Sequence, residues 1–323
     1  MRYTHNVFLT TIAADLRSAR LPIPLVAFLD GVRTVALRPH VLLATYVATL
    51  VVVMPMSVAI AGMLRNLIQS TPLAEETTRS VPLAVWDAIG RQSNGLASTF
   101  TPAILGIAAP LDNVSAMLEG RTPVAAIMAA AAAYGCVWIL LWGGVIGALA
   151  RGWHGWHDFV RSGVRSAGPV AVLTIGALVI YAALYLVVHP ILLPRQELAA
   201  GGEVSTAVRM LAFGGLLIAV NVFVDFARVR LVLGGGSAVR SAAATVRFVR
   251  QHGAAVIGLS MLNILPLAAA LGGYAAFEVI VRGVPSMWSA IVVGHLYVVA
   301  RLAARLITTA AQVHLWQRLE SGR

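Results

Sequence analysis

The stretch 123–151, PVAAIMAAAAAYGCVWILLWGGVIGALAR, decides the fold class of this chain. It contains no charged side chain before it ends on Arg151. A helix needs about 20 apolar residues to cross the hydrocarbon core of a bilayer, so this stretch predicts a membrane-spanning helix. The rest of the chain has a similar composition, because 59% of its 323 residues are hydrophobic and only 11% are charged. Soluble domains carry about 25% charged residues, so the composition indicates an integral membrane protein.

Six stretches of this kind predict an all-α polytopic protein, with residues 1–323 forming a single membrane domain. The expected spans are Val41–Leu64, Pro123–Ala150, Pro169–Leu192, Ala207–Leu231, Ala254–Val281 and Pro285–Thr308. Prolines at or just before four of the starts fit this assignment, because the first turn of a helix does not need their missing N–H. Pro266 lies inside the fifth span, one turn after Asn263, and predicts a kink there.

The arginines predict how these spans are oriented. The chain has 24 basic residues, all of them arginine, and the segments 1–40, 151–168, 228–252 and 301–323 hold five, three, five and four of them. Loops that stay in the cytoplasm keep an excess of positive charge. We therefore expect both termini inside a bacterial inner membrane, with residues 65–122 forming an outer-face loop that carries one or two short helices.

The net charge of +11 belongs to this same pattern. In a soluble protein it would suggest nucleic acid, but here it indicates inner loops in contact with anionic headgroups of the lipid bilayer. We expect no nucleic-acid partner.

Short amphipathic helices are predicted on the inner face. Ser237–Arg250 places a row of small apolar residues on one helix face, with its arginines off that face. The row consists of Val239, Ala242, Ala243, Val246 and Val249. Similar patterns precede the first span, within an interfacial segment 1–40, and the third span, around Trp156–Ala167. Such helices lie in the headgroup layer.

An internal repeat is suggested by three Ala-Arg pairs at the inner span ends. Arg151, Arg228 and Arg305 are separated by 77 residues and then by 77 again. One interpretation is a three-fold repeat of a short helix plus a hairpin. The other is that arginines gather at inner span ends in any protein with this topology.

One polar cluster stands out inside the predicted spans. It consists of Asn221, Asp225 and Arg228 on the fourth span and His295, Arg301 and Arg305 on the sixth. An unpaired charge in the membrane costs on the order of 3 kcal/mol, so we expect Asp225 to pair with Arg301 or Arg305. The cluster is then a structural clamp between spans, a polar pathway or anion site at the inner mouth, or simple arginine snorkelling without a pair.

No motif predicts a catalytic residue, a cofactor or a metal. His154, His157 and Asp158 have a spacing compatible with a metal, but two glycines weaken any helix there and no further ligand is evident. Two Trp and two His at a span end fit an interfacial aromatic anchor better. A haem held by two histidines is not expected, since only His295 lies well inside a span. Phosphate-binding, nucleophile-elbow and zinc-protease motifs are absent from the sequence, and Cys136 is its one cysteine.

Residues 207–265 carry a family resemblance. The stretch NVFVDFARVRLVLGGGSAVRSAAATVRFVRQHG, from Asn221, resembles six-pass bacterial membrane proteins of a glycerophosphodiester-phosphodiesterase-membrane-domain-like kind. The resemblance lies in an Asp-x-Ala-Arg span end followed by an amphipathic helix. It implies that Asp225, Arg228 and Arg230 are typical of that family. This chain has no separate phosphodiesterase domain, so the resemblance implies no enzymatic role.

The sequence favours a non-catalytic subunit or scaffold that packs against a partner membrane protein or forms a homo-oligomer. Small-residue faces, which let helices approach closely, support this interpretation. They include Gly143–Gly144 with Gly147, Gly214–Gly215 and Gly272–Gly273. The alternative is a transporter or channel for a small, anionic solute that uses Arg228, Arg301 and Arg305.

Overall fold

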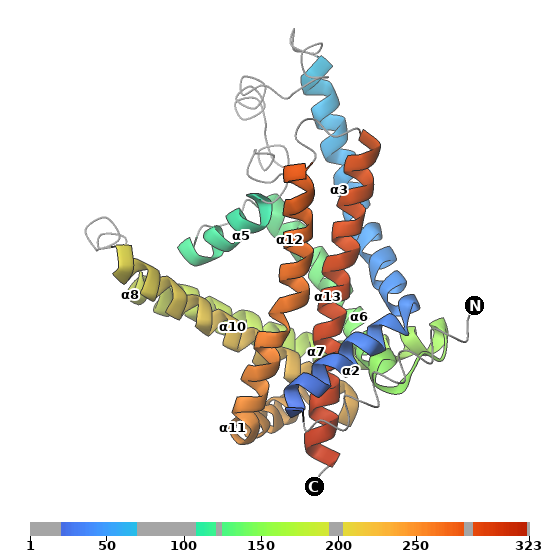
Figure 1. Ribbon diagram of the computed structural model, residues 1–323, viewed down its shortest axis with the longest axis vertical. Coiled ribbons are helices and arrows are strands. Elements are labelled where there is room, and N and C mark those ends of the chain that lie inside the picture. The colour runs from blue at the N-terminus through green and yellow to red at the C-terminus, as the bar shows by residue number, and fades with distance from the viewer. Residues whose placement is uncertain (1–20, 70–107, 121–124, 194–202, 281–286, 322–323) are drawn as a thin grey trace.

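The computed structural model describes residues 21–69, 108–120, 125–193, 203–280 and 287–321, which form helices with short connections and no strand (Figure 1). In chain order the helices are α2 (Ile23–Ala36), α3 (Pro39–Gln69), α5 (Ala108–Glu119), α6 (Ala125–Arg151), α7 (Trp156–Ala183), the π-helix η4 (Leu184–Val188), α8 (His189–Leu192), α10 (Glu203–Gly234), α11 (Ala238–Leu262), α12 (Ile264–Ile280) and α13 (Met287–Ser321). The prediction of a helical chain is confirmed for these residues.

Five stretches of helix are long and apolar enough to cross a membrane. A sixth joins them if α2 and the first part of α3, which are bent by 74° at their junction, count as one broken span. Membrane-length apolar helices are therefore confirmed, whereas the count of six depends on that bent pair. The three-fold repeat stays a prediction.

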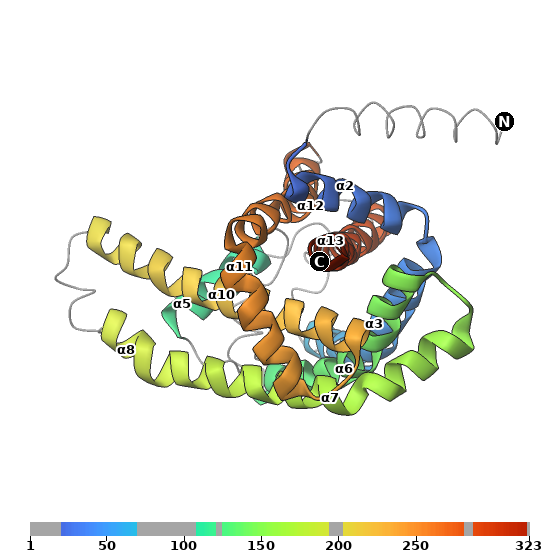
Figure 2. The same cartoon turned by 90° about the horizontal axis from the view of Figure 1, so that it is seen from below.

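The long helices run in two directions. Figure 1 shows α3, α12 and α13 along the long axis of the molecule, while α7 and α10 lie side by side across it. In Figure 2 the α7–α10 hairpin extends to one side, away from α13. The hairpin carries exposed apolar side chains, including Ile175, Leu186 and Leu211 at 60%, 77% and 75% exposure. Its outer surface is therefore apolar, as contact with lipid or another apolar helix requires.

Glycines bring α6 and α7 into backbone contact. A Cβ on Gly144 would lie 2.7 Å from the Phe159 carbonyl oxygen, and one on Gly163 would overlap the carbonyl oxygen of Leu140. Only hydrogen fits at these positions. The predicted small-residue face of α6 is thus confirmed as a close helix contact, and the partner that fills it is α7.

The predicted boundary at Pro169 is wrong, because α7 runs without a break from Trp156 to Ala183. A proline inside a helix removes one hydrogen bond and disfavours the helix locally. Here packing on both sides of the proline holds the helix: Gly163 lies against α6, and Val170 is fully buried. Tertiary contacts therefore override the local signal.

Near Pro266, where a kink was expected, the helix assignment is interrupted three residues earlier. α11 ends at Leu262 and α12 begins at Ile264, while Asn263 between them keeps nearly helical angles of φ −68° and ψ −12°. The amide N–H missing at Pro266 explains why the interruption lies within one turn before it.

The amphipathic helix expected at Ser237–Arg250 forms the first part of α11. The Ser237 side chain accepts a hydrogen bond from the Arg240 backbone N–H, and His252 has non-helical angles of φ −124° and ψ 26°. The helix is therefore capped at its start, as serine favours, and kinked next to Gly253. The predicted bounds are confirmed.

The row of small apolar residues predicted on this helix, expected to face lipid or the helix bundle, lies mostly on the side away from the bundle. Val239 and Val246 are 77% and 47% exposed, whereas the buried side carries Ala238, Ser241, Thr245 and Phe248. Phe248 stacks on Trp316 of α13 with ring centroids 4.2 Å apart, and it lies 5.6 Å from Phe226 of α10. The contact of Phe248 with Trp316 therefore sets which side of α11 faces α13, and the row of small apolar residues lies mostly outside that contact.

α2 packs along the C-terminal half of α13. A Cβ on Gly31 would lie 2.8 Å from the Ala311 backbone nitrogen, so the two backbones touch. Asp30 pairs with Arg318 on one side of this contact. Thr34 Oγ1 lies 2.8 Å from His314 Nε2 on the other. These contacts join the first described helix to the last.

The described parts of the arginine-rich segments, residues 21–40, 151–168, 228–252 and 301–321, lie toward one end of the molecule, the lower end in Figure 1 and the near end in Figure 2. One arginine at this end, Arg38, donates hydrogen bonds to the carbonyl oxygens of Ala148 and Leu149. Both carbonyls belong to the last turn of α6, where helix carbonyls run short of intrahelical donors. That of Ala148 also accepts a hydrogen bond from the Gly152 backbone N–H at 3.1 Å. That this end faces the cytoplasm stays a prediction.

Of the expected outer-face loop, the structure describes the end of α3 and the helix α5. The Tyr185 hydroxyl donates to the Met117 carbonyl oxygen at 3.0 Å, and His189 Nε2 lies 3.0 Å from that of Leu118. The end of α5 is therefore held against the tip of the α7–α10 hairpin. The amphipathic stretch Pro82–Arg91, which the sequence favours as one of the short helices of this loop, lies outside the described residues.

Candidate functional site

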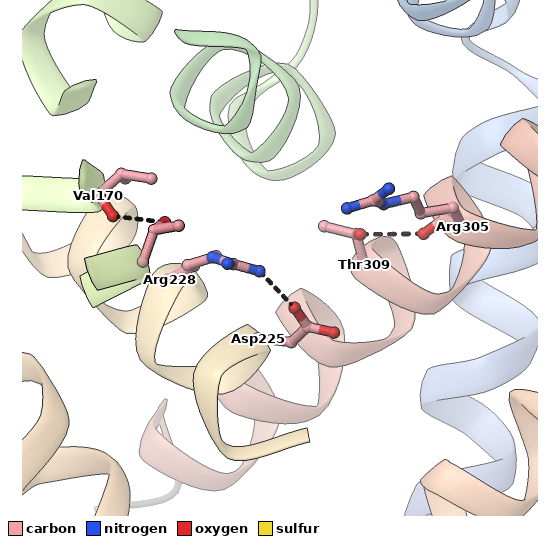
Figure 3. Close-up of polar contacts among 6 residues, drawn as sticks. Val170, Asp225, Arg228, Arg305 and Thr309 are labelled. Carbon is pink, nitrogen blue, oxygen red and sulfur yellow. Dashed lines mark hydrogen bonds and ion pairs between the residues drawn. The ribbon is translucent and has the colours of Figure 1, made fainter. Parts of the chain in front are cut away.

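The ion pair of Asp225 is formed within α10. Arg228 Nη1 lies 2.9 Å from Asp225 Oδ1, and these side chains are only 12% and 17% exposed (Figure 3). Residues three apart share a helix face, so this pair needs no second helix. Among the described residues neither Arg301 nor Arg305 reaches ion-pair distance, 4.0 Å, of Asp225. A direct ion pair between the two spans is therefore not formed, although Arg305 lies close enough to Asp225 for a charge–charge interaction.

Arg305 of α13 instead lies against tryptophans of α6. Its guanidinium carbon is 3.9 Å from the ring centroid of Trp138 and 5.0 Å from that of Trp142. The guanidinium carbon of Arg228, on α10, lies 5.1 Å from the ring centroid of Trp142. Each cation–π contact contributes about 0.5–2 kcal/mol, depending on how far it is desolvated. Arg305 thus has two aromatic contacts in addition to the charge of Asp225.

The two tryptophans form the wall of this cluster. They are 4% and 5% exposed, and their rings lie 5.1 Å apart one helical turn from each other. Three helices thus meet around two cationic side chains and one carboxylate. We name this set, Trp138, Trp142, Asp225, Arg228 and Arg305, the arginine–tryptophan cluster. It is net positive.

Two donors in the cluster have no acceptor among the described residues. They are Trp138 Nε1 and Arg228 Nε, both fully buried atoms. A buried donor without a partner costs about 1–3 kcal/mol. Such donors favour an additional acceptor group near this face of α6.

The other predicted members of the polar cluster lie elsewhere. Asn221, His295 and Arg301 are exposed on their helices. His295 Nδ1 lies 2.8 Å from the Ile291 carbonyl oxygen of its own helix, and the ring packs against Tyr46 with centroids 6.3 Å apart. Three of the six predicted residues therefore come together, on α10 and α13.

Sequence patterns alone did not identify these two tryptophans as part of the cluster. Trp138 and Trp142 are four residues apart in the interior of a predicted span, whereas membrane tryptophans gather at the interfaces. That unusual depth is a usable signal for a buried cationic partner.

The segment 153–158 forms a group of aromatic rings at the start of α7. The Trp153 ring lies 5.1 Å from that of Trp156 and 5.3 Å from that of Phe159. His157 Nδ1 lies 3.5 Å from Asp158 Oδ1 on the surface, and His154 Nδ1 lies 3.1 Å from the Gly152 carbonyl oxygen. In the described parts of the chain, no three His, Cys, Asp or Glu side chains gather as a metal site would require.

No protein-family model, no curated protein and no solved structure matches this chain. The resemblance seen in residues 207–265 stays a prediction.

Proposed function

We propose that this protein is a non-catalytic integral membrane protein that packs against a second membrane protein chain through α12. One observation carries the proposal: α12 presents an exposed small-residue face. Ala268, Gly272 and Ala276 follow one another at intervals of four residues and are all exposed, as are Ala269 and Gly273 beside them. No neighbouring atom of the described chain lies within 4 Å of where a Cβ on Gly272 or Gly273 would stand.

Small residues at this spacing favour helix association in a membrane. They let two backbones approach closely, so that van der Waals contacts between the helices replace contacts with lipid tails. The opposite side of α12 already packs on α13, where the ring centroids of Tyr274 and Tyr297 lie 4.8 Å apart. The exposed face is therefore free to receive a helix of another chain.

Cysteine cross-linking in native membranes tests this proposal. Cys136→Ser removes the one cysteine, and Ala269→Cys places a reporter on the exposed face of α12. We expect a discrete adduct with a short photoreactive cross-linker attached to this thiol, which inserts into any neighbouring side chain, at twice the chain mass for a second copy and at another mass for a different partner. Gly272→Leu should abolish it. Gly176→Leu, at an equally open glycine on α7, should leave it unchanged.

An adduct of the same yield in both leucine variants, or no adduct at all, would contradict the proposal. The first result would show that the glycines of α12 do not form the contact, and the second that α12 faces lipid rather than a partner helix.

The second candidate is passage of a small anion near the arginine–tryptophan cluster. The two buried donors of Trp138 and Arg228 favour it, together with the positive charge of Arg228 and Arg305. Flux of chloride and phosphate into proteoliposomes separates the candidates. Transport predicts flux above that of protein-free vesicles, and a loss of that flux with Arg305→Gln.

A further inference from the structure

A basic cavity lies where the ends of α6, α7 and α10 meet. It has a volume of about 670 Å³ and is lined on one side by Arg151, Arg161 and Arg165. Arg161 and Arg165 are four residues apart, so they share one face of α7. The volume falls within the range of about 300–1,000 Å³ typical of small-ligand sites.

These three arginines have no carboxylate partner within ion-pair distance among the described residues. The one acid that lines the cavity is Asp158, and its Oδ1 lies 3.5 Å from His157 Nδ1. The wall therefore carries three positive charges against one negative charge. It attracts an anion, and planar guanidinium groups suit the oxygens of a phosphate.

The opposite wall of the cavity is apolar. It is formed by the end of α10, Leu231–Leu233. The chain then turns sharply at Gly235 and Gly236, whose φ angles of 66° and 100° are readily adopted only by glycine. A ligand in this cavity would meet charge on one side and hydrocarbon on the other.

The same two arginines of α7 also border a shallow, open apolar groove on the surface of that helix, lined by α7 alone. Trp156, Val160 and Val164 line it, at 56%, 56% and 63% exposure. Arg161 and Arg165 thus stand between the groove and the cavity. This arrangement matches a molecule with an anionic head and an apolar tail, because the head can reach the arginines while the tail follows the groove.

We propose that this cavity binds a phosphate ester, held by Arg151, Arg161 and Arg165. The phosphate belongs either to the headgroup of an anionic phospholipid or to a soluble phosphate compound. The apolar groove favours the lipid. The site is independent of the proposed contact through α12, which lies on another helix.

Lipid retention by the full-length protein tests the site. The protein is exchanged into mild detergent with mixed phosphatidylcholine and phosphatidylglycerol, and native mass spectrometry then measures the phosphatidylglycerol that remains bound. We expect a bound phosphatidylglycerol on the wild type. The double variant Arg161→Gln/Arg165→Gln should bind it at least about tenfold more weakly, since it loses two charge-assisted hydrogen-bonding groups.

The matched control is Arg240→Gln/Arg247→Gln. It removes the same charge from exposed positions on α11, outside the cavity lining, and should change the affinity by less than about threefold. Equal retention by the wild type and both double variants would overturn the proposal. Equal losses in both variants would also overturn it, because they would show a general charge effect.

Soluble competitors distinguish the two sources of phosphate. Glycerol phosphate and inorganic phosphate are titrated against the protein in phosphatidylcholine nanodiscs. Binding of either, lost in Arg161→Gln/Arg165→Gln, assigns the cavity to a soluble phosphate compound. No binding of either, together with specific phosphatidylglycerol retention, assigns it to a lipid headgroup.

A second variant keeps the test decisive if the double variant fails to fold. Asp158→Asn removes the one negative charge of the cavity wall from an exposed position. It should tighten phosphatidylglycerol or phosphate binding a few-fold, whereas an unchanged or weaker affinity would contradict the proposal.

Discussion

Two glycine-rich helix faces of this protein differ in whether another helix of the same chain covers them. On α6, Gly143, Gly144 and Gly147 lie against α7, and half of the most apolar stretch of that span is buried. On α12, Gly272 and Gly273 have open space around them, and only 11% of the apolar stretch of the α11–α12 span is buried. The same sequence signature therefore marks a capacity for close contact, and the neighbouring helices decide whether this chain uses it.

Filling the closed face should have the largest effect on stability. Gly163→Val places a side chain where the carbonyl oxygen of Leu140 already lies, and we expect it to lower the free energy of unfolding by about 3 kcal/mol. Denaturation of the purified protein in mixed micelles measures this. Gly176→Val, on the open side of the same helix, is the control and should change it by less than about 0.5 kcal/mol. Equal effects would mean that the two faces do not differ.

Removing the arginine that caps α6 should come next. Arg38→Ala leaves the Ala148 and Leu149 carbonyl oxygens without their shared donor, so we expect a loss of about 2 kcal/mol in unfolding free energy. Arg33→Ala serves as the control, because Arg33 is exposed on α2. A loss no larger than that of the control would show that this contact does not hold the closed region together.

The arginine–tryptophan cluster extends the comparison to charged side chains. A double-mutant cycle of Asp225→Asn and Arg228→Gln should give a coupling of about 1 kcal/mol, because their oxygen and nitrogen are 2.9 Å apart. The cycle of Asp225→Asn with Arg305→Gln should give a smaller coupling. A larger value for the second cycle would restore the clamp between α10 and α13.

The smallest stability effect is expected on the open face. Gly272→Ala adds one methyl group in open space, and alanine favours a helix by up to about 1 kcal/mol over glycine. The unfolding free energy of the separated chain should therefore stay unchanged or rise slightly. A clear loss of stability would show that α12 is packed within its own chain.

The sequence predicted those features that depend on neighbours along the chain. Apolar runs located the long helices, and Ser237, Asn263 and Pro266 marked the start of α11 and its end. The spacing of Asp225 and Arg228 indicated that they share one helix face, although the partner predicted for Asp225 was Arg301 or Arg305 and not Arg228.

Features that depend on distant neighbours were not predictable in this way. Pro169 indicated a helix boundary that packing against α6 overrides. The stack of Phe248 on Trp316 turned the small apolar residues of α11 outward. Arg305 meets Trp138 because of the relative rotation of α13 and α6, which no local pattern contains.

One paired measurement tests the central claim most directly, that α6 uses its glycine face within the chain and α12 uses its own between chains. Gly163→Leu and Gly272→Leu are each compared with the parent chain in two assays. These are the unfolding free energy of the separated chain and the yield of the Ala269→Cys adduct in native membranes. The account predicts that Gly163→Leu lowers stability and that Gly272→Leu removes the adduct while leaving stability intact. A loss of stability in Gly272→Leu, or an adduct that survives it, would contradict the account.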